Sequence, residues 1–126
     1  MFEINETTGA IAMSGGDTGG FTITPTVEGQ GDTPGILLFS VKNSAGVLLI
    51  SRQYPMVSGE PIDIEFGNAD TDSWPAGMYS WDVRGILNPM FDGEEGDPDR
   101  HVVDGDQVLT PRRPMSLTIV ATVGKV

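Results

Sequence analysis

Residues that could do chemistry gather in two stretches of this chain. The first is "SGGDTGGF", residues 14–21, where the Thr18 hydroxyl follows an aspartate and lies between two pairs of glycines. The second is "FDGEEGDPDRHVVDGD", residues 91–106, which holds seven acidic residues, one arginine and the single histidine of the chain, His101. A hydroxyl next to a base suggests a nucleophile, and clustered carboxylates suggest a site for a hard cation. Each suggestion has a simpler structural alternative.

The stretch around Thr18 looks like the Gly-Asp-Ser-Gly-Gly box of chymotrypsin-type proteases, with Thr18 where the serine stands. Such a nucleophile needs a base within hydrogen-bond reach and a group that orients the base. The only candidate base, His101, follows Thr18 in the chain, whereas those proteases place histidine first. Glycines allow positive φ, and the Asp17 side chain can cap a turn. We therefore interpret the stretch as a glycine-rich turn that leads into a strand at Phe21.

The acidic stretch offers five oxygen ligands of the kind that Ca²⁺ prefers. Its spacing is neither that of an EF-hand nor that of a repeated calcium-binding β-roll, so a solvated hairpin tip is the favoured interpretation and weak Ca²⁺ binding is the alternative. His101 is interpreted as a surface side chain rather than a base or a metal ligand. Spacing leaves open an acid–base pair of two of these carboxylates, although no aromatic sugar platform lies nearby in the sequence. The calcium candidates are Asp92, Glu94, Glu95, Asp97 and Asp99.

Aromatic residues give a second set of binding candidates. Modules that bind carbohydrate display aromatic rings flat on a surface, and Trp74 and Tyr54 lie at the expected ends of strands where such display is feasible. Tyr79 and Trp81 fall on the expected inner face of a strand, which favours packing in the core. Trp74 and Tyr54 are therefore the candidates for contact with a partner or a glycan.

Charge restricts the class of partner. Seven basic residues against eighteen acidic ones give a net charge of -11, which repels phosphate backbones, so we expect no nucleic-acid partner. The pair Arg112 and Arg113, fenced by prolines in "TPRRP", predicts a rigid turn before the last strand. This pair is also an interface candidate, because it could dock on the acidic stretch of another copy and so support self-association.

The composition predicts one domain, residues 1–126, with a hydrophobic core of its own. The chain has no cysteine, which excludes a disulfide framework and a thiolate metal site, and we expect no cofactor. Its start, "MFEINETTGAI", lacks the apolar run of a signal peptide, and no window approaches the roughly eighteen apolar residues of a membrane span. We therefore expect a protein that is made in a cytoplasm and does not insert into a membrane.

The pattern of apolar residues predicts an all-β fold. Glycines and prolines interrupt the chain every eight to twelve residues or so, and no stretch keeps an apolar 3.6-residue period over three turns. About seven to eight antiparallel strands are expected, within residues 2–4, 11–13, 21–27, 36–41, 47–54, 61–66, 77–87 and 113–123. That number is typical of an immunoglobulin-like β-sandwich. The predicted core consists of Phe21, Ile23, Leu37, Phe39, Ile62, Ile64, Tyr79, Trp81, Val83, Leu117 and Ile119.

A short motif favours the immunoglobulin-like type of sandwich. In "PAGMYSW", Tyr79 follows a glycine turn and precedes Trp81 by two residues. Immunoglobulin-like domains place a tyrosine corner at this position, with the hydroxyl bonded to the upstream backbone and a core residue two positions later. The motif predicts that Tyr79 bonds the segment before it and that Trp81 is buried.

The order of these signals resembles a known family. An opening "MFEIN" is followed by "GGDTGGFTI", "ILLFSVKNSAG", "IDIEF", "WPAGMYSWDVRGI" and "LTPRRPMSLTI". This order is similar to that in short phage and prophage tail proteins, in particular the N-terminal immunoglobulin-like domain of phage baseplate upper proteins. In that pattern a Phe-Ser/Thr-Val-Lys strand precedes a Gly-x-Tyr-x-x-Asp-Val/Ile strand, as residues 39–42 and 77–83 do here. Segment 88–106 is longer than the usual hairpin.

The resemblance implies a function without chemistry. It implies a non-enzymatic structural or adaptor module in the virion, in a tail or baseplate, which binds other tail proteins and carries no catalytic residues to transfer. The alternative is a carbohydrate-binding module that contributes to adsorption on the host surface. Both are expectations at this point.

Overall fold

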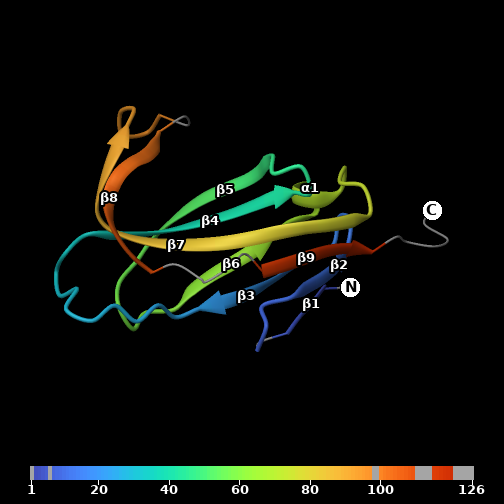
Figure 1. The fold of residues 1–126 in the computed structure, drawn as a ribbon, viewed down its shortest axis with the longest axis horizontal. Helices are drawn as coiled ribbons and strands as arrows, with labels where there is room; N and C mark the ends of the chain where they lie inside the picture. Colours follow the sequence, from blue (N-terminus) through green and yellow to red (C-terminus); the bar gives the residue numbers. More distant parts are fainter. Residues whose placement is uncertain (1, 6, 98–99, 110–114, 121–126) are drawn as a thin grey trace.

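The computed structural model describes residues 2–5, 7–97, 100–109 and 115–120. Two β-sheets form two layers, and a long hairpin leaves one end of them (Figure 1). The strands are β1 (Phe2–Ile4), β2 (Ile11–Ser14), β3 (Gly19–Ile23), β4 (Gly35–Asn43), β5 (Leu48–Pro55), β6 (Ile62–Phe66), β7 (Gly77–Asp92), β8 (His101–Leu109) and β9 (Met115–Val120), and a single helical turn, α1 (Asn68–Thr71), follows β6. The predicted all-β sandwich is confirmed.

The larger sheet has seven strands in the order β1-β2-β9-β7-β4-β5, with β8 paired to β7. β4 and β7 form its centre, through a register that runs from Gly35 opposite Leu87 to Asn43 opposite Tyr79. β2 pairs with β9 in parallel, and every other pair in this sheet is antiparallel. A parallel pair needs a long connection between its strands, and here the connection is most of the chain.

The smaller sheet consists of β3 and β6, paired antiparallel from Gly19 opposite Phe66 to Ile23 opposite Ile62. The predicted strand over 21–27 ends at Ile23, earlier than expected. Pro25 has no N–H to donate to β6, so the ladder cannot continue through it. Its carbonyl instead accepts the Gly59 N–H at 2.8 Å, and the Val27 N–H donates to the Ser58 hydroxyl.

The core lies between the two sheets. Phe39 is fully buried, and its ring meets those of Phe21, Phe66 and Trp81 at centroid distances of 6.3, 5.9 and 5.9 Å. All eleven predicted core residues belong to this core, eight of them buried and Phe21, Ile23 and Tyr79 partly buried against it. Buried apolar residues that were not in the predicted set are Ile11, Met13, Val27, Val41, Met56, Phe66 and Ile86.

The tyrosine-corner prediction is confirmed in its two contacts. The Tyr79 hydroxyl donates a hydrogen bond to the Pro75 carbonyl at 2.6 Å, four residues upstream. Trp81 is 5% exposed, and its indole N–H donates to the Gly9 carbonyl at 2.8 Å. These bonds tie the start of β7 to the preceding loop and to the turn between β1 and β2.

The number and direction of the strands differ from the prediction. The described residues form nine strands instead of seven or eight, and β2 runs parallel to β9 rather than antiparallel. The additional strand is β8, which was assigned to the acidic stretch. Its side chains are mostly exposed, so no apolar alternation marks it in the sequence. It is a strand because its backbone pairs with β7.

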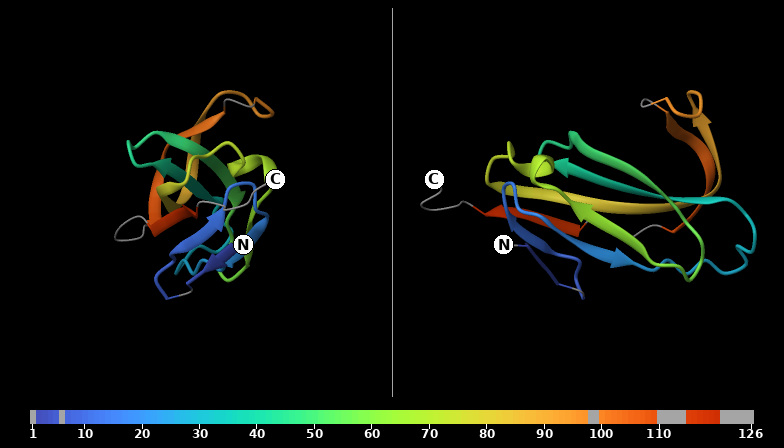
Figure 2. Two further views of the ribbon diagram at one scale, coloured as in Figure 1. Left: turned by 90° about the vertical axis from the view of Figure 1, so that its right-hand side faces the viewer. Right: turned by 180° about the vertical axis from the view of Figure 1, so that it is seen from behind.

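The far parts of β7 and β8 form an arm, residues 88–105, that turns away from the two layers (Figures 1 and 2). The pairing of β7 with β8 shifts register at Gly85/Ile86, Leu87/Met90 and Met90/Phe91. Asn88 has a φ of 50°, and its N–H donates to the Pro34 carbonyl at 2.8 Å. Register shifts of this kind bend a strand, so they account for the turn of the arm.

Candidate interaction surfaces

The glycine-rich stretch around Thr18 is a turn, as predicted. The Ser14 N–H donates to the Asp17 carboxylate at 2.8 Å, and the Asp17 N–H donates to the Ser14 carbonyl at 3.1 Å. Gly16 has a φ of 82°, and its N–H donates to the Thr71 hydroxyl at 3.0 Å, which ties the turn to α1. The glycines and the aspartate that make this stretch look like a protease box form and stabilise a turn.

The two glycines after Thr18 are required by close packing. A Cβ on Gly19 would lie 2.3 Å from Cγ of Phe2, and a Cβ on Gly20 would lie 2.5 Å from the Ile64 carbonyl oxygen. Neither glycine has a positive φ. Their role is to let β1 and β6 approach β3 closely.

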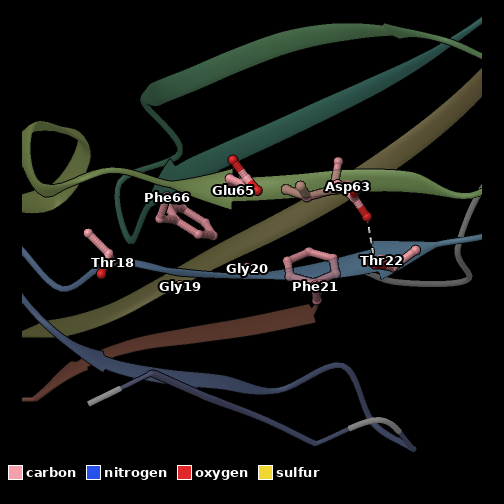
Figure 3. A pocket seen from close by; sticks show the side chains of 9 residues that line it. Thr18, Gly19, Gly20, Phe21, Thr22, Asp63, Glu65 and Phe66 are labelled. Carbon is pink, nitrogen blue, oxygen red and sulfur yellow. Dashed lines mark hydrogen bonds between the residues drawn. The ribbon is translucent and has the colours of Figure 1, made fainter.

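A shallow hollow lies on the outer face of the smaller sheet, where Gly20 has no side chain (Figure 3). Thr18 lies at one end, and at the other the Thr22 hydroxyl donates to Asp63 at 2.8 Å. Glu65, opposite Gly20, adds a second carboxylate. The residues around the hollow include no histidine and no basic group that could activate Thr18.

The acidic candidates lie at the tip of the arm. Asp92 ends β7, and its carboxylate is 3.9 Å from Nε2 of His101, which begins β8 and is 61% exposed. Glu94, Glu95 and Asp97 are exposed in the turn, where the Asp97 N–H donates to the Glu94 carbonyl at 3.0 Å. Asp99 lies outside the described residues. The part of the chain that the structure describes holds no group of three metal-ligating side chains placed around one point.

The tip of the arm is closed by an arginine on an aromatic ring. The Arg100 guanidinium lies 3.8 Å from the centroid of the Phe91 ring, and the Arg100 N–H donates to the Asp97 carbonyl at 3.1 Å. Gln53 of β5 donates from Nε2 to the Arg100 carbonyl at 3.4 Å. These contacts set the tip above the outer end of β5.

The structure separates the two aromatic candidates, Trp74 and Tyr54. Trp74 stacks on Tyr79 with centroids 5.0 Å apart, at the end of β4 marked by Asn43. Tyr54 is opposite Leu37, six residues farther along β4, which is about 20 Å of strand. Both rings are partly buried against the core. Trp74 borders a hollow of about 330 Å³ shared with Asn43, Ser44 and Leu49.

The basic interface candidates, Arg112 and Arg113, lie outside the described residues. In the described ranges no helix is long and apolar enough to cross a membrane.

An ion pair that the sequence does not reveal joins the two sheets at one side. Arg52 of β5 contacts Asp70 of α1 at 2.8 Å and donates a further hydrogen bond to the Glu65 carbonyl at the outer edge of β6. Burial alone would raise the pKa of the Asp70 carboxyl. The hydrogen bonds from Arg52 and from the Gly67 N–H, together with the arginine charge, outweigh burial and hold that pKa below its ordinary value.

The outer face of the larger sheet holds one unexplained polar atom. Asp82 Oδ1 is buried and has no hydrogen-bond partner in the described structure, while its other oxygen is 3.8 Å from Nε of Arg84. The carboxylate borders a shallow hollow of about 220 Å³ with Ser40, Lys42 and Leu48. In the sequence, Asp82 and Arg84 look like ordinary outward charges of a strand, so nothing distinguished them.

The arm also displays apolar side chains. Met90 is 60% exposed and Val103 is 59% exposed, both beside the register shift that bends the arm. Their place on a projecting element makes them candidates for contact with another protein.

Comparisons with known proteins give no match: no protein-family model, no curated protein and no solved structure is significantly similar to this chain.

Proposed function

We propose that this protein is a non-enzymatic adaptor of a phage or prophage tail or baseplate, which acts in the virion through contacts with other tail proteins. The phage setting rests on the sequence resemblance described above. The immunoglobulin-like type of the sandwich belongs to the same proposal. It is supported by the strand order β2-β9-β7-β4-β5, by the parallel β2–β9 pair and by the Tyr79 corner.

The proposed contact with other tail proteins rests on the arm. It projects beyond the two layers, and it exposes Met90 and Val103 next to an acidic tip with Glu94 and Glu95. Exposed apolar side chains rimmed by charges are typical of a surface that binds another protein. The charge of the tip favours a partner surface that is basic at the rim.

Purified particles from a strain that carries the gene test this proposal. We expect the protein to copurify with the tail in a fixed ratio to the other tail proteins, as measured by quantitative mass spectrometry. A variant in which residues 89–104 are replaced by a two-residue Asn-Gly turn should fold but should not be incorporated into the particle. The proposal is wrong if the wild-type protein is absent from particles, or if the variant without the arm is incorporated equally well.

A carbohydrate-binding role is the second candidate, and the hollow beside Trp74 favours it. The aromatic pair Trp74 and Tyr79 forms one wall, and Asn43 and Ser44 add polar groups of the kind that bind sugar hydroxyls. Binding of the protein to a panel of host-surface glycans would test it. Trp74→Ala should abolish binding and Tyr54→Ala should leave it unchanged, because Tyr54 lies far from this hollow; equal losses would contradict the site.

A further inference from the structure

Among the described residues, no strand pairs with the outer edge of β5. In the larger sheet β5 is the terminal strand, bound to β4 through a register from Ile36 opposite Pro55 to Val41 opposite Ile50. The Met56 N–H donates to the Gly35 carbonyl in the same register. Because hydrogen-bonded and non-bonded positions alternate, residues 50, 52 and 54 direct their N–H and C=O groups to β4. Ser51 and Gln53 direct theirs outward.

The composition of β5 lacks the usual protection of an edge. Proteins block a free edge with charged side chains, prolines within the strand or a covering segment. The one charged residue of β5, Arg52, is engaged with Asp70 and with the Glu65 carbonyl at the side of the smaller sheet. The one proline, Pro55, lies at the last position of the strand, where its missing N–H faces outward.

The charge distribution favours a second copy at this edge. The chain has a net charge of -11, yet residues 33–59, which include β4 and β5, contain no aspartate or glutamate. The same range holds Lys42 and Arg52. Two copies of an acidic protein repel each other least where carboxylates are few, and the acidic tip of the arm approaches β5 at Gln53, two residues from Ser51.

The edge also complements itself. If a two-fold axis passes beside Ser51, this residue lies opposite its own copy, Gln53 lies opposite Leu49, and Val47 lies opposite Pro55. The exposed apolar residues flank the strand at both ends, with Val47 at 53% and Leu48 at 52% on one side and Val57 at 45% on the other. A two-fold axis brings each end of the strand against the other end in the second copy.

We propose that two copies of this protein form a symmetric dimer in which their β5 strands pair antiparallel about Ser51, so that the two larger sheets become one continuous sheet. This inference goes beyond the adaptor function and does not depend on the phage setting. The arm reaches β5 at Gln53, whose side chain donates to the Arg100 carbonyl. Ser51→Lys leaves that contact in place, so loss of the dimer and loss of the arm-mediated contact are separable by this variant.

Sedimentation over a range of concentrations is the first test. The wild-type protein should pass from monomer to dimer as concentration rises. Ser51→Lys places two like charges at the axis and should weaken the dimer by about tenfold or more, whereas Ser51→Thr should change it by less than about twofold. A wild type that stays monomeric, or a dimer that Ser51→Lys does not weaken, overturns the proposal.

Disulfide trapping gives an independent test, because the chain contains no other cysteine. In a hydrogen-bonded antiparallel pair the two Cα atoms are about 5.5 Å apart, within the range that a disulfide spans. Ser51→Cys should therefore form a covalent dimer quickly under mild oxidation. Ser44→Cys, exposed in the turn before β5, is the matched control and should react slowly. Equal rates for the two variants would overturn the proposed register.

Amide hydrogen exchange adds an internal control within one strand. The outward N–H groups of Ser51 and Gln53 should become protected as concentration rises. Those of Arg52 and Tyr54, which bond β4 in the monomer, should be protected at every concentration. Outward amides whose protection does not depend on concentration would contradict pairing at this edge.

Discussion

The two halves of β7 show how differently one strand can be held. From Gly77 to Gly85 the strand lies in the middle of the larger sheet. It pairs with β4 on one side and, from Gly77 to Trp81, with β9 on the other, and it buries Trp81 and Val83 in the core. Beyond Leu87 it pairs with β8 in the arm, where Met90 is 60% exposed and the Asp92 side chain is 73% exposed. The backbone ladder continues through both halves, but the packing does not.

In this strand, hydrogen bonding sets the shape of the backbone, and burial of side chains sets the local stability. The net contribution of a hydrogen bond is about 1 kcal/mol, whereas a buried large side chain contributes about 1.5–3 kcal/mol. We therefore expect the body, residues 2–87 with β9 and the last part of β8, to unfold as one unit, and the arm to open locally at lower free energy.

The same substitution placed in the body and in the arm should give the largest contrast. Phe39→Ala removes a fully buried ring that contacts three other rings, and it should lower the free energy of unfolding by about 3–5 kcal/mol. Phe91→Ala removes a half-buried ring under Arg100 and should cost less than about 1 kcal/mol. Urea unfolding followed by tryptophan fluorescence measures both; comparable losses would mean that the arm belongs to the body.

Gly20→Ala should give the next effect, through a close backbone approach in the body. The new methyl group would lie 2.5 Å from the Ile64 carbonyl oxygen, so β3 and β6 must separate, at a cost of about 1–3 kcal/mol. Thr18→Ala, two residues away and exposed, is the control and should stay within about 0.5 kcal/mol of wild type. Thermal unfolding of the two variants compares them. If Gly20→Ala does not change the stability, β3 and β6 can separate enough to accept the methyl group without cost.

The ion pair between Arg52 and Asp70 should have a smaller effect that depends on pH. Both side chains are about one-third exposed or less, and Asp70→Asn should cost about 1 kcal/mol at pH 7. Because the pKa of Asp70 is lower in the folded protein, its contribution is complete above the unfolded pKa, about 4, and is lost as the pH falls through the folded value.

The measurement is urea unfolding of the wild type and of Asp70→Asn at several pH values. The difference between them should be constant near neutral pH and should narrow below about pH 4. Asp72→Asn, exposed just after α1, is the control for the exchange of an aspartate for an asparagine in this region. A difference that persists unchanged at low pH would mean that the carboxylate charge is not what stabilises this corner.

Local patterns in the sequence were sufficient to predict the body. Strict alternation in "IDIEF" placed Ile62 and Ile64 inside, and the Tyr79 motif predicted both a backbone bond and the burial of Trp81. Long-range pairing could not be predicted in the same way. The parallel contact of β2 with β9 joins residues about a hundred positions apart, and no local period encodes the direction of such a pair.

The candidate surfaces were predicted less well, because their signals are not periodic. The acidic tip and Trp74 were found from their residue types, but β8 was missed because both of its faces are largely exposed. The Arg52–Asp70 pair joins two elements that only the tertiary fold brings together. The β5 edge was not among the candidates, although residues 33–59 form a stretch without a carboxylate in a strongly acidic chain.

The smallest expected change in stability belongs to the arm, and it carries the most information about function. Met90→Lys replaces a side chain that is 60% exposed, so the free energy of unfolding should change by less than about 0.5 kcal/mol. If the exposed apolar side chain is a docking contact, the same variant should be lost from particles because a lysine cannot be buried there without cost. Val120→Lys, a comparable change on the body, should be retained. A Met90→Lys protein that is destabilised by more than about 1 kcal/mol would show instead that this face of the arm packs within the monomer, and the division between body and arm would have to be moved.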